Sequence, residues 1–216
     1  MDRIAAKLDA ISGGIIQNFQ EKYAARDKAL QGGREVIRHS ANAIRAVHRY
    51  DLAQARQLLE QARHTLATID QALVRHPDVY HAGFVQDAQK EYAEASITLA
   101  IVGEQDLPGP EELRVSYAAY LNGAGEVIGE LRRQVLDRIR KGEVQRCEAL
   151  LAAMEDIYGM LITVDFPDAM TGGLRRTTDA ARAILERTRG DLTISLSQNA
   201  LEQHMKEFQR SLDKDL

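Results

Sequence analysis

Tryptophan is absent from this chain of 216 residues, and aromatic residues make up only 5% of it. A protein that stacks the bases of a single strand needs several aromatic side chains, so such a platform would depend here on a few tyrosines and phenylalanines. A basic excess is also lacking, since the formal net charge is −4. This charge argues against a general basic nucleic-acid binder, although a local basic surface can exist on an acidic chain.

Cysteine and long apolar runs are nearly as scarce. Cys147 is the single cysteine, so no disulfide can form within the chain, as is usual in reducing compartments. The N-terminal segment MDRIAAKLDA mixes acids and bases and lacks the basic-then-apolar order of a secretion signal. No apolar run approaches the roughly 18–20 residues of a membrane span. We therefore expect a cytoplasmic protein without a membrane partner.

Proline is rare too, with four residues, while 44% of the chain is hydrophobic. Apolar residues recur at helical spacing nearly throughout, and no repeat or linker divides the chain. We predict one all-α domain over residues 1–216, a bundle of about seven helices. A short first helix after Asp2 is expected to be interrupted at Gly13–Gly14. The further expected helices are 15–50, 51–75 (with Asp51 as the N-cap), 79–104, 111–141, 143–164, 174–190 and 191–216.

The segment KEYAEASITLAIVGE, residues 90–104, contains two acids on a helix with an apolar stripe. The stripe has helical spacing and predicts the core-facing side: Val85, Ala88, Tyr92, Ala95, Leu99 and Val102. Glu91 and Glu94 lie on a second stripe, roughly 100° away on the helical wheel. They are one turn apart, so their carboxylates can converge on a hard cation such as Mg²⁺ or Mn²⁺. An acidic flank facing water is the alternative, and spacing alone leaves both open.

A second candidate acid lies in ALLAAMEDIYGMLITV, residues 149–164, where Glu155 and Asp156 are the only charges. A helix this apolar is covered by neighbouring helices or by another subunit. Since burial of an unpaired carboxylate is costly, an acid here faces a specific partner, a solvent slot or an ion pair.

The segment GEVIGELRRQVLDRIRK, residues 125–141, combines acids with a basic end. Glu126 and Glu130 form an i, i+4 pair, and Arg132 and Arg133 begin the basic part. Basic residues near a helix C-terminus interact favourably with the helix dipole. They could instead bind phosphate or form ion pairs between subunits.

Two long segments show a resemblance to the translin family, which includes translin and its partner Trax. VDFPDAMTGGLRRTTDAARAILERTRGDL, residues 164–192, resembles the loop and helix near the end of translin. AYLNGAGEVIGELRRQVLDRIRKGEV, residues 119–144, resembles the family's Tyr-Leu-x-Gly segment and the Glu-Leu pair that follows it. The order of segments corresponds from about Lys22 to Leu212. No single motif is as specific as a zinc signature, but the ordered set is fairly specific.

Within that family translin is catalytically inactive, whereas Trax has a magnesium-dependent ribonuclease site. The Trax segment Glu-Tyr-x-Glu-Ala matches EYAEA here, at Glu91 and Glu94, and translin lacks this glutamate pair. Asp156 best matches a further Trax aspartate. The resemblance therefore implies a Trax-like member of archaeal or prokaryotic type. Its catalytic metal ligands would be Glu91, Glu94 and Asp156, with Glu130 as a possible fourth.

The resemblance also implies an activity and an assembly. We expect a Mg²⁺-dependent endoribonuclease, with Mn²⁺ as an alternative ion, acting on short or single-stranded RNA inside a closed homo-oligomer such as an octamer. Candidate phosphate contacts are Arg132, Arg133, Lys90 and Arg75. The alternative is a non-catalytic oligomer that binds RNA or single-stranded DNA, as translin does, but such a binder has no need of the EYAEA pair.

Overall fold

The computed structural model describes residues 2–212, and that part of the chain is helical with no strand. Six long helices form the molecule: α1 (Asp2–His48), α2 (Leu52–Leu73), α4 (Phe84–Val102), α6 (Tyr117–Arg140), α7 (Glu148–Ile162) and α9 (Leu174–Leu212). Single turns connect them: α3 (Pro77–Tyr80), α5 (Pro110–Leu113), the 3₁₀ turn η1 (Val144–Arg146) and α8 (Asp168–Thr171). The predicted all-α class is confirmed for residues 2–212.

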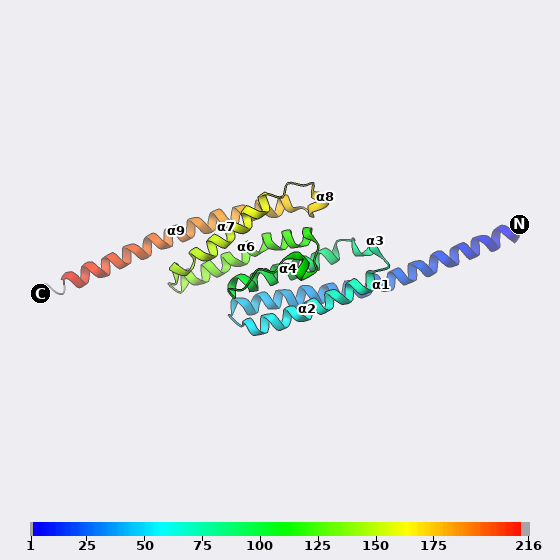
Figure 1. The fold of residues 1–216 in the computed structure, drawn as a ribbon, viewed down its shortest axis with the longest axis horizontal. Coiled ribbons are helices and arrows are strands. Elements are labelled where there is room, and N and C mark those ends of the chain that lie inside the picture. The colour runs from blue at the N-terminus through cyan, green and yellow to red at the C-terminus, as the bar shows by residue number, and fades with distance from the viewer. Residues whose placement is uncertain (1, 213–216) are drawn as a thin grey trace.

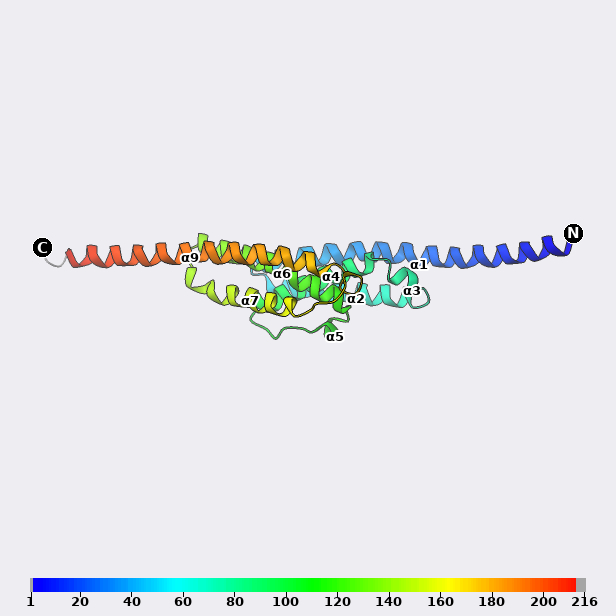
Figure 2. The same ribbon diagram turned by 90° about the horizontal axis from the view of Figure 1, so that it is seen from above.

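Helices α4 and α6 pack against each other at the centre of the bundle, and the other long helices pack against these two (Figure 1). Helices α1 and α2 pack on the α4 side, and α7 and α9 pack on the α6 side. The start of α1 and the end of α9 extend beyond the bundle in opposite directions, so the two termini lie at opposite ends of an elongated molecule (Figure 2).

Local signals explain where the helices begin. The Asp51 side chain accepts a hydrogen bond of 3.1 Å from the Gln54 backbone N–H, which confirms it as the N-cap of α2. Ser116 caps α6 in the same way through the Ala119 backbone N–H. The expected helix 111–141 therefore begins later, at Tyr117. Arg114 is left-handed, with φ of 54°, and separates the single turn α5 from α6.

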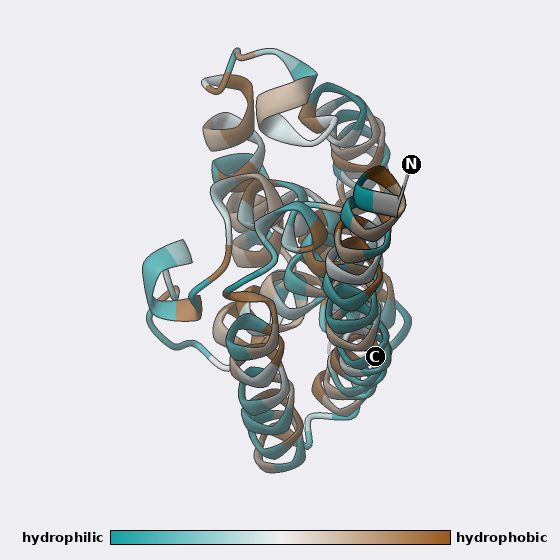
Figure 3. Cartoon of the chain, turned by 90° about the vertical axis from the view of Figure 1, so that its right-hand side faces the viewer, coloured by the Kyte–Doolittle hydropathy of each residue, from teal (hydrophilic) through white to brown (hydrophobic). Residues whose placement is uncertain are grey.

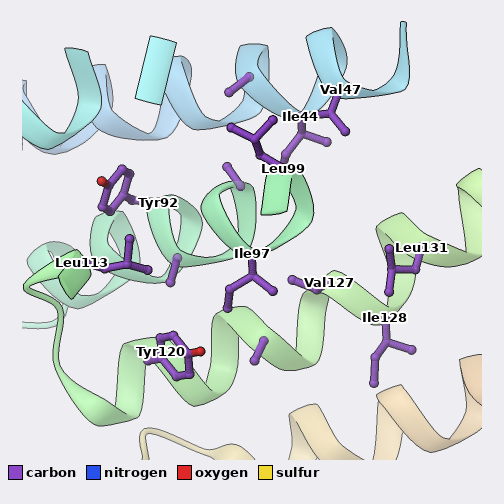
Figure 4. Close-up of a cluster of buried hydrophobic side chains, with 14 of the residues drawn as sticks. Ile44, Val47, Tyr92, Ile97, Leu99, Leu113, Tyr120, Val127, Ile128 and Leu131 are labelled. Carbon is purple, nitrogen blue, oxygen red and sulfur yellow. The ribbon is translucent and has the colours of Figure 1, made fainter. Parts of the chain in front are cut away.

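The apolar stripe predicted on the segment 79–104 faces the core. All six of its side chains are buried: Val85, Ala88, Tyr92, Ala95, Leu99 and Val102. Leu99 points toward Ile44 and Val47 of α1, whereas Ile97 points toward α6 on the other side (Figure 4). Burial of a large apolar side chain contributes roughly 1.5–3 kcal/mol, so α4 is fixed mainly by this packing.

Three glycines predicted to end helices do not do so. Gly13 and Gly14 lie within α1, and Gly190 lies within α9. A glycine inside a helix costs only about 1 kcal/mol relative to alanine, and no proline stands next to these positions to break the hydrogen-bond ladder. The predicted first and last pairs of helices are therefore one helix each.

The projecting ends of α1 and α9 expose apolar side chains. We call residues 3–21 the α1 arm and residues 200–211 the α9 arm, since every residue in both ranges is exposed. The apolar positions recur every three or four residues, and brown and teal segments alternate along the start of α1 in Figure 3. In the α1 arm they include Ile4, Leu8, Ile11, Ile15 and Phe19, and in the α9 arm Leu201, Met205 and Phe208.

Within residues 2–212, no helix has both the length and the apolar character that crossing a membrane requires.

Candidate metal centre

Three carboxylates from the two central helices meet at one place. Glu91 and Glu94 extend from α4 and Glu126 extends from α6, and each offers one oxygen within 4.8 Å of the other two. Among residues 2–212 this is the group of acids and histidines close enough to hold a metal ion. Glu94 is buried, with 7% of its surface exposed, and the other two are half-buried. We call these three residues the acidic cluster.

A glycine on α6 allows the two helices to approach so closely. A Cβ atom added to Gly123 would lie 2.7 Å from the Lys90 carbonyl oxygen and 3.0 Å from the Glu94 nitrogen. Both neighbours are backbone atoms of α4, in the turn that carries the acids. Gly123 therefore brings Glu126, less than one turn further along α6, next to Glu91 and Glu94.

The opposite face of α6 receives the start of α9. A Cβ atom on Gly125 would lie 2.4 Å from the Thr177 methyl group. Asn122 ties the same region together, since its amide donates to the Thr171 carbonyl at 2.8 Å and its oxygen accepts from the Thr177 hydroxyl at 2.6 Å. These contacts fix α8 and the beginning of α9 beside the acidic cluster.

A cavity of about 750 Å³ lies between α4, α6 and the start of α9. Glu94, Glu126 and Lys90 line it on the side of the central helices, and Arg176 and Thr177 line it on the side of α9. The acidic cluster thus borders a space of the size that holds small ligands in proteins.

The electrostatics of the cluster favour a bound cation. Burial raises the pKa of Glu94 to about 8, and repulsion from Glu126, Glu91 and Glu130 adds to the increase, while Lys90 opposes it. Without a further positive charge, the Glu94 carboxyl is therefore largely protonated at neutral pH. A divalent cation would remove the cause of the shift, since it stabilises all three carboxylates.

The three oxygens suit Mg²⁺ in number, kind and spacing. Mg²⁺ prefers oxygen ligands at about 2.0–2.1 Å, so two ligands on opposite sides of one ion are about 4.2 Å apart. The upper limit of 4.8 Å between cluster oxygens exceeds this by an amount that small side-chain rotations remove. Three protein ligands leave the rest of an octahedral shell for water, which Mg²⁺ usually retains.

A lysine already neutralises part of the cluster. The Lys90 Nζ lies 2.7 Å from a Glu126 oxygen and 3.3 Å from a Glu91 oxygen. Burial lowers the pKa of Lys90, but the hydrogen bond and attraction from Glu126, followed by those from Glu91, outweigh it and raise that pKa. Lys90 therefore stays protonated and lies beside two of the three carboxylates.

Glu130, the possible fourth ligand, has a different partner. Its carboxylate contacts Nε2 of His48, at the end of α1, and this hydrogen bond is the main reason that its pKa is lowered. On the other side of the ring, His48 Nδ1 lies 3.0 Å from the Gln134 amide nitrogen. Tyr50 also donates to the Gln134 oxygen at 3.0 Å. Glu130 thus fastens α6 to α1 and is not in the acidic cluster.

Asp156, the third ligand implied by the resemblance, is not brought to the cluster either. It is exposed on α7, and α7 packs mainly against α6 and α9. The third carboxylate within the chain comes instead from Glu126. Helical spacing pairs Glu126 only with Glu130. The small residues before it in NGAGE permit close helix packing, and this is the sequence feature that could have indicated a contact between Glu126 and another helix.

The four predicted phosphate contacts have different surroundings. Lys90 is engaged with the acidic cluster, as described above. Arg132 pairs with Asp191 at 2.8 Å and holds α6 to α9. Arg133 and Arg75 are exposed, and within residues 2–212 neither makes an ion pair in this structure.

Comparison with known proteins identifies the family. No family model matches the chain. An uncharacterized protein of Methanocaldococcus jannaschii, MJ0175, is 29% identical over 203 residues, which cover 93% of this chain and 90% of that protein. The solved structure of apo-NeC3PO has a TM-score of 0.77 over 85% of this chain and 96% of its own, and at 21% identity it shows the shared fold alone.

Two further solved structures are more similar in sequence. The crystal structure of AfC3PO is 33% identical, with a TM-score of 0.78, over 86% of this chain and 97% of its own. AfC3PO in complex with duplex RNA is 32% identical, with the same TM-score, over 86% of this chain and 96% of its own. Because this identity extends over nearly the whole of AfC3PO, the chain belongs to the translin/C3PO family, as its sequence segments indicated.

Proposed function

We propose that this protein is a Mg²⁺-dependent endoribonuclease whose metal ligands are Glu91, Glu94 and Glu126. The observation that carries the proposal is the convergence of these three carboxylates within 4.8 Å, beside a cavity of about 750 Å³. In this proposal Glu126 takes the place that the resemblance gave to Asp156.

The substrate we propose is RNA. AfC3PO has been solved with duplex RNA, which supports RNA as the ligand class, and the proposed substrates here remain short or single-stranded RNAs. Single-stranded DNA is a second ligand to test. Arg133 and Arg75, both exposed, remain proposed phosphate contacts, whereas Arg132 would first have to leave Asp191.

Each residue has a defined part in the proposed chemistry. Glu91 and Glu126 hold the ion from two helices, and Glu94 supplies the buried ligand, which binds only after it loses its proton. When bound, Mg²⁺ stabilises negative charge at the scissile phosphate and makes an attacking water more acidic. The polar groups of the cavity then orient the strand.

Cleavage of labelled single-stranded RNA tests the proposal directly. With Mg²⁺ the protein is expected to cut the RNA, and with a chelator it is expected to bind the RNA more weakly and to leave it uncut. The double variant Glu91→Ala/Glu94→Ala should behave in Mg²⁺ as the unaltered protein does with chelator. Cleavage that survives both chelator and substitution would reject the metal site. RNA that is bound but never cut under any condition would favour a non-catalytic binder.

We also propose that the chain assembles into a closed homo-oligomer, for which the octamer remains the predicted size. The support is the exposed apolar face of the two arms, whose side chains are each 47–69% exposed in the single chain. Contiguous exposed apolar surface of this kind marks interaction sites in proteins, and a periodic stripe on a helix fits a second helix.

A charge placed on the stripe is expected to reduce the assembly. Leu8→Asp/Ile15→Asp puts two carboxylates on the apolar face of the α1 arm, where their burial against another copy is costly. Light scattering should then give a lower mass than for the unaltered protein. The matched control, Ala10→Asp/Gln17→Asp, adds the same charges at the same spacing, roughly 200° around the helix, and should keep the mass. An unchanged mass for the first variant would show that this stripe is not an interface.

A further inference from the structure

Among residues 2–212, Lys90 is the cation that both pairs with the acidic cluster and lines the adjoining cavity. Its ammonium lies 2.7 Å from Glu126 and 3.3 Å from Glu91, and it also lines the adjoining cavity. Only a quarter of its side chain is exposed. The same group can therefore reach the metal ligands and the space where a substrate would lie.

We propose that Lys90 is an exchangeable counter-ion of the acidic cluster. In the metal-free protein it holds Glu91 and Glu126, the incoming Mg²⁺ displaces it, and the freed ammonium then contacts an RNA phosphate in the cavity. This inference rests on the proposed function, because it assigns a role to Lys90 within the same site.

The exchange follows from the repulsion between two cations. If the ammonium kept its 2.7 Å contact with a Glu126 oxygen that also bound Mg²⁺ at about 2.1 Å, the two positive charges would be at most about 5 Å apart. At that distance in a half-buried site they repel appreciably. The divalent ion has the stronger attraction for the three carboxylates, so the lysine is the cation that leaves.

A lysine is well suited to such a movement. Its charge is a compact ammonium on a flexible chain of four carbons, and it can turn without any change in the backbone. An arginine would bind a carboxylate through a rigid planar fork and would be harder to release. The released ammonium also has space to move into, because Lys90 already lines the cavity.

The charge of the cavity makes the exchange useful. Four acids line it, Asp87, Glu94, Glu126 and Asp168, against the two cations Lys90 and Arg176. Even with Glu94 protonated, three negative charges face two positive ones, so the lining repels a phosphate in the absence of metal. Binding of Mg²⁺ adds two positive charges, of which loss of the Glu94 proton offsets one, and it releases the ammonium from its carboxylate partners. The order that follows is metal first and RNA second.

The first test measures metal affinity in the absence of RNA. Isothermal titration of Mn²⁺ into Lys90→Met should give about tenfold tighter binding than for the unaltered protein, because the competing cation is gone. Lys90→Arg keeps the charge and should bind no more tightly than the unaltered protein. Lys22→Met removes a lysine from a comparable ion pair, 2.8 Å from Asp78, and should have no effect. Thermal unfolding shows that each variant is folded.

The second test measures RNA affinity by stopped-flow anisotropy, before cleavage occurs. Addition of Mg²⁺ should increase the affinity of the unaltered protein for a short RNA, and Lys90→Met should lose about threefold to tenfold of that increase. With chelator the two proteins should bind alike, since Lys90 is then occupied. A lysine with only a structural role would not increase metal affinity and decrease RNA affinity in one substitution.

Failure of this inference can be told apart from failure of the proposed function. If the unaltered protein cleaves RNA with Mg²⁺ but Lys90→Met binds Mn²⁺ equally or more weakly, the counter-ion role is rejected and the nuclease remains. If Lys90→Met binds Mn²⁺ more tightly but keeps the full gain in RNA affinity, the phosphate contact is rejected and the inference fails as stated. If the unaltered protein binds no Mn²⁺, the metal site itself is rejected.

Discussion

Glu94→Gln is expected to abolish RNA cleavage and to make the metal-free protein more stable, increasingly so as pH rises from about 4.5 to about 8. Loss of a charged ligand should lower the rate by at least about a hundredfold, since even groups that only orient metal ligands contribute about 10–100-fold. The amide has the same shape as the carboxyl, so packing is retained. The opposite effects on activity and stability have one cause, the buried charge.

The stability effect depends on pH in a defined direction. The pKa of Glu94 is about 8 in the folded protein, raised by burial and by Glu126 and Glu91, against 4.5 for an ordinary glutamate. The folded state therefore holds a proton that the unfolded state releases. Stability is lost as pH rises from about 4.5, and the loss is complete above about 8. For a shift of this size the loss amounts to roughly 3–5 kcal/mol.

Thermal unfolding in chelator from pH 5 to pH 9 measures this difference. The unaltered protein should become less stable with rising pH relative to Glu94→Gln, and Mg²⁺ should restore most of the loss above pH 8. Glu35→Gln, an exposed glutamate on α1, should change neither the pH profile nor cleavage. Parallel profiles for Glu94→Gln and the unaltered protein would show that the Glu94 carboxyl is not the group responsible.

Gly123→Ala is expected to destabilise the protein by about 3 kcal/mol, at the upper end of the cost of overpacking. The new methyl group would lie 2.7 Å from the Lys90 carbonyl oxygen and 3.0 Å from the Glu94 nitrogen. Neither atom can rotate away, because both belong to the backbone of α4. The helices must separate, and the separation moves Glu126 away from Glu91 and Glu94, so metal affinity should fall as well.

Denaturant unfolding in chelator, with Mn²⁺ titration of the folded variant, measures both effects. The control is Gly159→Ala on α7, where an added Cβ has no atom within 4 Å. That change should stabilise the protein by about 0.4–1 kcal/mol, through better helix propensity and a less flexible unfolded chain. Equal stabilities for the two alanine variants would contradict the close contact between α4 and α6.

The sequence predicted those features of the site that arise within one helix. The pairing of Glu91 with Glu94 follows from helical spacing, and the buried stripe of α4 follows from its apolar periodicity. The partner acid could not be predicted in this way, because it depends on which helices touch and in what register. Glu126 reaches the cluster through the Gly123 contact, which is a property of two packed helices.

Helix boundaries show the same division. Asp51 was correctly predicted to start a helix, because a cap hydrogen bond acts on the adjacent turn. Gly13–Gly14 and Gly190 were wrongly predicted as breaks, because a glycine only lowers helix stability slightly. The rest of the helix outweighs that small cost.

The opposite directions of the two arms limit the symmetry of any assembly that uses them. A contact between like arms of two chains has a two-fold axis, and two such contacts per chain close only with an even number of subunits. A contact between the α1 arm of one chain and the α9 arm of another is head-to-tail, so all chains in the assembly run in the same direction. Such an assembly closes as a ring with any number of subunits or continues as a filament. An odd number of subunits would therefore exclude pairing of like arms, whereas the predicted octamer is compatible with it.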